Sequence, residues 1–167
     1  TIRQKHTVSS RIIKIQLAEN GDLLMLTKNK VLLQGHSAGK GKIDVELLYD
    51  SKSTRENKLT NNLLVENQHY INWIGIDYKI ISLRKADLLK DKPADYLIRK
   101  ISRQQPQVYT AAHDDHHLLW LGTEEGVVYR VNVHNGSISR WEQFKGKGSI
   151  ENLIIAGDQT IAVSVKG

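Results

Sequence analysis

The sequence contains no cysteine and two prolines. Without cysteine the chain can form no disulfide, no thiolate metal site and no thiol nucleophile, although this absence does not identify a cellular compartment. No stretch has the pattern of a signal peptide or an apolar run long enough to cross a bilayer. In a piece of a longer protein, such segments would lie outside these 167 residues.

Motifs of the common enzyme classes are also missing. The sequence has no nucleophile elbow, no metal-protease helix and no glycine-rich dinucleotide fingerprint. The neighbouring Glu124 and Glu125 have no facing carboxylate that would favour glycoside hydrolysis. We therefore expect a protein that is not an enzyme and that uses no cofactor and no metal ion.

The formal net charge is +6, from 24 lysines and arginines against 18 acidic residues. The basic residues are scattered along the chain and do not alternate with aromatic residues. This charge permits an anionic partner, but we expect no nucleic acid, since charged side chains also protect the edges of sheets.

An internal repeat is the strongest signal in the sequence. Residues 120–127 (WLGTEEGV) align without a gap on residues 73–80 (WIGIDYKI), and the aromatic, the branched aliphatic, the glycine and the closing aliphatic residue all match. Shorter matches begin at Met25 and Ala162, so the four anchors lie 48, 47 and 42 residues apart. A period of about 40 to 50 residues that contains four short strands is typical of a β-propeller blade.

The anchor residues have structural explanations. We expect Trp73 and Trp120 to fill the space between neighbouring blades, because large aromatic residues mostly serve packing. The matching Gly75 and Gly122 would let neighbouring backbones approach closely or let the strand bend.

The sequence thus predicts an all-β fold, a β-propeller fragment of about three and a half four-stranded blades. We predict these segments: 1–10, the tail of a preceding blade or a linker; 11–50, blade 1; 51–62, a connector; 63–102, blade 2; 107–144, blade 3; 150–167, the first half of blade 4. Closed propellers typically have about four to eight blades. We therefore expect the remaining blades of a longer parent chain, or a second copy in a homodimer, to cover the exposed edges.

Topology selects candidate ligand-binding residues. In propellers the loops between second and third strands gather on the face around the central channel, which usually binds the ligand; this step is an analogy with the fold class. A polar rim with one tyrosine suits a sugar or another polar ligand, and ordinary solvent-facing loops are the alternative. The residues in these loops are Lys28, Asn29, Lys30, Asp77, Tyr78, Lys79, Glu124 and Glu125.

The segment 113–117 (HDDHH) is the densest set of potential metal ligands. Imidazole and carboxylate are usual donors to zinc. In an extended hairpin, however, successive side chains point in alternate directions, so at most two or three could converge. The segment joins the first and second strands of a blade, on the face opposite the expected ligand entrance. We therefore interpret it as a solvated turn.

Residues 119–130 (LWLGTEEGVVYR), followed by 134–138 (HNGSI), resemble the two-component regulator propeller repeat. That repeat has an acidic turn, then Leu-Trp-Ile-Gly-Thr, a glycine, a short strand that ends near Tyr or Arg, and a turn with glycine. The second blade matches through 73–80, where Ile76 stands in place of the threonine and Lys79 in place of the later glycine.

The resemblance implies the periplasmic sensor region of a bacterial hybrid histidine kinase that senses polysaccharide fragments. The kinase and the membrane connection would lie outside this chain. We expect a non-enzymatic ligand-sensing segment that binds an oligosaccharide or another polar ligand. Two alternatives stay open: a protein-interaction scaffold without a small-molecule ligand, and a lyase-type propeller that uses His113 or His116 with a metal ion.

Overall fold

The regular structure of the chain consists almost entirely of antiparallel β-strands. The computed structural model describes residues 10–18, 20–29, 31–50, 63–74, 79–87, 97–100, 107–114, 117–156 and 160–166. Within these residues, no helix has the length and the apolar character that crossing a membrane requires. The predicted all-β class is confirmed.

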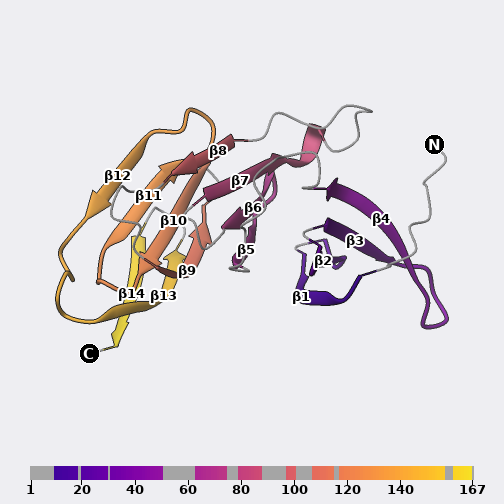
Figure 1. The fold of residues 1–167 in the computed structure, drawn as a ribbon, viewed down its shortest axis with the longest axis horizontal. Helices are drawn as coiled ribbons and strands as arrows, with labels where there is room; N and C mark the ends of the chain where they lie inside the picture. The colour runs from indigo at the N-terminus through magenta and orange to yellow at the C-terminus, as the bar shows by residue number, and fades with distance from the viewer. Residues whose placement is uncertain are drawn as a thin grey trace. The chain divides into compact units, whose positions relative to one another are not determined.

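The strands form four sheets in chain order (Figure 1). The first sheet contains β1 (Ile12–Leu17), β2 (Leu23–Thr27), β3 (Val31–Ser37) and β4 (Ile43–Asp50). The second contains β5 (Leu63–Glu66), β6 (Tyr70–Ile74), β7 (Lys79–Arg84) and β8 (Leu97–Lys100), with the 3₁₀ helix η2 (Lys85–Asp87) after β7. The third contains β9 (Val108–His113), β10 (Leu118–Thr123), β11 (Val128–Asn132) and β12 (Ile138–Trp141). The fourth contains β13 (Ser149–Ala156) and β14 (Thr160–Lys166).

In every sheet, each strand pairs with the next one in the sequence. This up-and-down order is the strand order of a propeller blade. The chain divides into two units, Thr1–Asn62 and Leu63–Gly167, so the first sheet belongs to one unit and the other three sheets to the second. Each unit has its own internal contacts.

The anchors of the sequence repeat occupy equivalent strands. Each lies in the second strand of its own sheet: Met25 in β2, Trp73 in β6, Trp120 in β10 and Ala162 in β14. Trp73 is 1 % exposed and Trp120 is 3 % exposed, as expected of side chains that serve packing.

Apolar side chains pack between successive sheets of the second unit. Because side chains alternate between the two faces of a strand, β10 contributes to two cores. Trp120 faces β13 and packs with Ile150 and Leu153. The opposite face of the third sheet packs against the second sheet in a cluster of buried residues: Tyr70, Ile74, Ile80, Val108, Leu119, Leu121, Val127, Tyr129, Val131 and Val133. Apolar side chains are thus buried on both faces of the third sheet.

Gly122 marks a close approach between the third and fourth sheets. A Cβ atom at this position would overlap the side chain of Ile150 and would lie 2.7 Å from the Cγ2 atom of Thr110. The space beside this glycine is filled by side-chain atoms of the neighbouring strands, so its lack of a side chain allows close packing. The matching Gly75 lies outside the described residues.

We expect Gly122→Ala to destabilise the protein by about 2 to 3 kcal/mol, because the added methyl group would displace Ile150 from a packed core. Urea unfolding followed by tryptophan fluorescence measures the loss. The control Gly146→Ala adds a methyl group with no atom within 4 Å. It should cost only the penalty for a positive φ, about 1 kcal/mol. A double-mutant cycle with Ile150→Ala checks the cause, and strictly additive losses would contradict the clash.

The first sheet contains a histidine between two carboxylates. Nδ1 of His36 lies 2.9 Å from Asp22 Oδ2, and Nε2 lies 3.0 Å from Glu46 Oε1. The hydrogen bond with Glu46 raises the pKa of His36, and Asp22 adds to this rise, while partial burial opposes it. Burial acts to raise the pKa of Asp22, but hydrogen bonds from Gln34, His36 and Asn20 lower it overall. The arrangement therefore favours an imidazolium between two anions.

This arrangement makes stability depend on pH. Since the folded pKa of His36 lies above its usual 6.5, its stabilising contribution is complete below the unfolded value. The contribution is lost as the pH rises through the raised folded pKa. His36→Gln should therefore lower the melting temperature of the full chain more at about pH 6 than at about pH 9. Glu46→Gln should weaken the same pH dependence, and equal losses at both pH values would show that His36 does not act as a cation.

Candidate functional site

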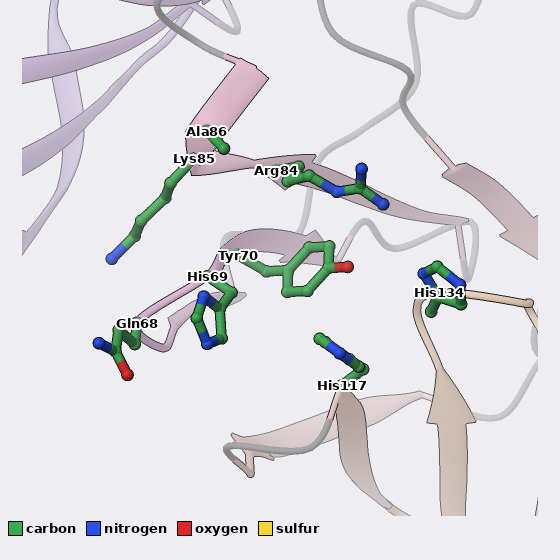
Figure 2. A pocket seen from close by; sticks show the side chains of 8 residues that line it. All are labelled: Gln68, His69, Tyr70, Arg84, Lys85, Ala86, His117 and His134. Carbon is green, nitrogen blue, oxygen red and sulfur yellow. The ribbon is translucent and has the colours of Figure 1, made fainter.

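A cavity of about 350 Å³ opens where turns of the second and third sheets meet (Figure 2). We call it the histidine pocket. Its lining residues are Gln68, His69, Tyr70, Arg84, Lys85, Ala86, His117 and His134.

Four chain connections supply these residues. Gln68 and His69 precede β6, Tyr70 begins β6, Arg84 ends β7, Lys85 and Ala86 follow in η2, His117 precedes β10, and His134 lies between β11 and β12. In an up-and-down sheet, the first and third connections lie at the same end of the strands, which explains why these turns converge. Two backbone hydrogen bonds close the turns: Lys85 N–H donates to the His69 carbonyl and Val133 N–H to the His117 carbonyl, both at 2.9 Å.

The buried side chain of Asn67 connects the two sheets beside the pocket. It is 2 % exposed. Its Oδ1 accepts hydrogen bonds from the backbone N–H groups of His69 at 2.9 Å and Tyr70 at 2.7 Å, which fixes the β5–β6 turn. Its Nδ2 donates to the carbonyl oxygen of Asp114 at 2.7 Å, at the end of β9. The same nitrogen lies 2.8 Å from Nδ1 of His113.

Aromatic rings surround His117. Its ring centroid lies 6.1 Å from that of His69 and 5.8 Å from that of His134. The ring of Tyr70 meets it edge-on at 5.3 Å and stacks on His113 at 5.9 Å on the other side. Three imidazoles therefore border one small cavity.

The described lining carries positive or titratable groups and no carboxylate. Lys85 forms an ion pair with Glu66, and in Figure 2 its side chain extends away from Tyr70 and His134. The guanidinium of Arg84 extends to the side on which His134 lies. Arg84 and the imidazoles therefore determine the charge of the pocket.

His117 has three unusual properties. Its φ is +69°, a left-handed conformation that residues other than glycine rarely adopt. Its Nδ1 is buried and has no hydrogen-bond partner among the described residues. Burial lowers the pKa of His117, and the positive charges of His134, His69 and Arg84 lower it further, although Asp114 opposes them. Strained backbone, an unpaired polar atom and a perturbed pKa are typical of functional sites.

The interpretation of 113–117 as a solvated turn was wrong for part of the segment. Asp114 is 6 % exposed, and its Oδ1 accepts a hydrogen bond from Leu118 N–H at 2.8 Å. His113 and His117 pack on Tyr70 of the neighbouring sheet, which a single strand pattern does not reveal. Asp115 and His116 lie outside the described residues. No group of three or more ligating side chains in the described part of the chain could hold a metal ion.

Four of the residues predicted from topology, Lys28, Asn29, Glu124 and Glu125, do not line the histidine pocket. Lys28 and Asn29 are exposed in the β2–β3 turn of the first unit, and Glu124 and Glu125 are exposed in the β10–β11 turn of the second unit. Glu124 N–H donates to the Gln107 carbonyl at 2.9 Å. Lys79 is the first residue of β7. Lys30, Asp77 and Tyr78 lie outside the described residues.

The histidine pocket was not predicted from the sequence, although the sequence contains one signal of it. His69 and His117 each lie in the turn between the first and second strands of a sheet, and His134 lies in the next turn at the same end of the third sheet. Histidines that recur in equivalent turns of a repeat indicate a shared surface.

No protein-family model and no curated protein sequence matches this chain. Solved structures do resemble it. Virginiamycin B lyase from Staphylococcus aureus, a β-propeller, superposes with a TM-score of 0.57 at 14% sequence identity over 98% of this chain. The structure of U3-55K superposes with a TM-score of 0.56 at 11% identity over 87% of this chain. At such low identity these likenesses show the fold alone.

The chain is a partial β-propeller. It spans 58% of the lyase and 43% of U3-55K. The propeller part of the resemblance noted in the sequence is therefore confirmed.

Asn67→Ala should destabilise the protein by about 3 kcal/mol, because it removes the acceptor of two backbone N–H groups of the turn and the buried hydrogen bond from Asn67 Nδ2 to the Asp114 carbonyl. Asn132→Ala is a matched control, since the Asn132 Oδ1 accepts two similar hydrogen bonds, from His134 and Asn135 N–H, within its own turn. We expect a loss of about 1 kcal/mol there. Chemical unfolding measures both losses, and equal values would mean that the bond between the sheets contributes nothing.

Proposed function

We propose that this propeller segment binds a small, polar and negatively charged ligand in the histidine pocket and does no chemistry on it. One observation carries the proposal: three imidazoles, a guanidinium and a tyrosine from two neighbouring blades border one open cavity, with no carboxylate in its described lining. Positively charged and N–H donor groups in a lining that contains no carboxylate favour an anionic ligand.

Size and surface chemistry agree with a sugar derivative. A volume of about 350 Å³ is at the lower end of the range of small-molecule pockets, roughly 300 to 1,000 Å³. The exposed rings of His69 and His134 offer both flat faces and N–H donors, and Gln68 adds an exposed amide. A short acidic oligosaccharide combines the ring faces, hydroxyls and charge that these groups recognise.

The position of the pocket between two blades supports the proposal of a signalling role. A ligand that contacts His69 on one sheet and His134 on the next would link the sheets in addition to Asn67. Together with the resemblance of 119–130 to the two-component regulator repeat, this supports a sensor role. In this proposal the segment is periplasmic, and it signals to a kinase outside the chain.

Two alternative functions compete with this proposal. A protein-interaction scaffold would use the same turns to hold a partner and would bind no small ligand. The lyase alternative from the sequence, with His113 or His116 and a metal ion, gains little from the likeness to virginiamycin B lyase. At 14% identity that likeness shows the fold and identifies no catalytic residue.

Calorimetric titration against a panel of neutral and acidic oligosaccharides tests the proposal. We expect an acidic member to bind, and we expect Arg84→Ala or His134→Ala to weaken that binding at least about tenfold, since each removes a charged or N–H donor on an exposed lining residue. Lys28→Ala and Glu124→Ala, in the loops selected from the sequence, serve as controls and should leave the affinity unchanged.

Three outcomes would contradict the proposed function. Loss of binding in the Lys28 or Glu124 variants alone would return the site to the loops between second and third strands. Stable capture of a protein partner, with no heat from any sugar, would favour the scaffold. Turnover of the bound sugar would show an enzyme.

A further inference from the structure

His117 lies at the centre of the charges in the histidine pocket. Its neighbours are His69 from the β5–β6 turn and His134 from the β11–β12 turn, with ring centroids 6.1 Å and 5.8 Å away. Tyr70 at the start of β6 contacts its edge. Arg84, at the end of β7, adds a permanent positive charge to the pocket.

Two carboxylates of the described residues bear on the charge around His117. Asp114 acts on His117 at a distance, and its Oδ1 already accepts the Leu118 N–H. Glu66 is paired with Lys85. The adjacent Asp115 and His116 lie outside the described residues.

The backbone of His117 is held in place, but the hydrogen-bonding capacity of its ring is not satisfied among the described residues. The backbone carbonyl of His117 accepts the Val133 N–H at 2.9 Å, and the residue adopts a positive φ. Its buried Nδ1 has no hydrogen-bond partner among the described residues. A buried nitrogen without a partner costs stability, so a ligand atom that completes its hydrogen bonding would be favoured.

Protonation of His117 is costly in the free protein, because the ring is partly buried and the charges of His134, His69 and Arg84 oppose a further positive charge. An oxyanion bound beside the ring offsets this cost and accepts the N–H bond that protonation creates. Binding of the anion and protonation of His117 therefore favour each other, as any two linked binding events must.

We infer that the histidine pocket recognises a terminal oxyanion, such as a sulfate, phosphate or carboxylate group, and that His117 takes up a proton when this group binds. The inference rests on the proposed function and adds to it both the charged group that is recognised and its dependence on pH.

The direction of the pH dependence follows from linkage. In the free protein, burial and the neighbouring positive charges lower the pKa of His117 below its usual 6.5, so the ring is neutral at neutral pH. A bound oxyanion raises this pKa. Affinity should therefore increase as the pH falls through the raised pKa of the complex and should level off below the pKa of the free protein.

Inorganic sulfate is a suitable first probe, because it does not titrate in this range. Calorimetric titrations of the full chain at about pH 5.5 and about pH 7.5 should show at least about tenfold tighter binding at the lower pH. Titrations in two buffers of different ionisation enthalpy should show net uptake of protons at the higher pH. A monosaccharide sulfate ester and the same sugar without sulfate complete the panel: tighter binding of the ester than of free sulfate would identify a sugar-borne group, and equal binding a free anion.

The decisive variant is His117→Asn. Asparagine tolerates a positive φ better than most residues and has no titratable group, so the turn should keep its conformation while proton uptake disappears. His36→Gln, a change of the same kind in the first unit, should leave proton uptake unchanged. Proton NMR of the imidazole C–H signals gives a second measurement: the His117 signal, identified by its absence in His117→Asn, should titrate at a higher pH when sulfate is bound.

Several results would overturn the inference. Sulfate affinity that is the same at both pH values, with no proton uptake, would do so, as would uptake that persists in His117→Asn. If the neutral sugar binds as well as its ester, the pocket recognises sugars without an oxyanion, and the proposed sugar-binding role survives alone. If no probe binds at either pH, both the inference and the proposed function fail.

Discussion

The hydrogen bonds of Asn67 are the constraint on which the candidate site depends. One buried amide fixes the β5–β6 turn through two backbone N–H groups and, through its other end, holds the carbonyl oxygen of Asp114 on the next sheet. An apolar contact would allow the two turns to slide, whereas a buried hydrogen bond is directional and costly to break. His69 and His117 therefore face each other at a defined distance because of a residue that does not itself line the pocket.

Packing between the sheets sets the distance that the side-chain amide of Asn67 spans. A four-stranded sheet cannot bury its own apolar faces, so each face needs a neighbour. The third sheet has one on both sides: Leu121 packs towards the second sheet, and Trp120 packs towards β13. Gly122 lets β13 approach so closely that Ile150 occupies the space of a side chain. The presence or absence of single side chains thus sets the spacing of the sheets. This spacing in turn sets the distance between the turns at the ends of the strands.

The sequence predicted those features that recur from one blade to the next. Trp73 and Trp120 stand in equivalent strands because each solves the same packing problem, so an alignment of the chain with itself finds them. The histidine pocket does not belong to a single blade, since His69, His117 and His134 come from two sheets and meet only through the placement of those sheets. The sequence pattern predicts the direction of the strands but not the contacts between sheets. Candidate ligand-binding residues such as Glu124 and Glu125 were therefore predicted from their loops, by analogy with the fold class. For the same reason, His113 and His117 were predicted to be solvated.

The two perturbed histidines show which parts of the chain are arranged for stability and which are not. His36 has a raised pKa because Glu46 and Asp22 hold its proton, so protonation stabilises the folded state. His117 has a lowered pKa, chiefly because of burial and then because of the charges of His134, His69 and Arg84. As the pH falls below the usual 6.5 towards that lowered value, the folded state therefore loses stability. A fold selected for stability alone has no reason to bring three imidazoles together and to leave a buried nitrogen among them without a partner. The proposed anionic ligand would supply that reason, because it would convert the same cluster from a cost into a source of binding free energy.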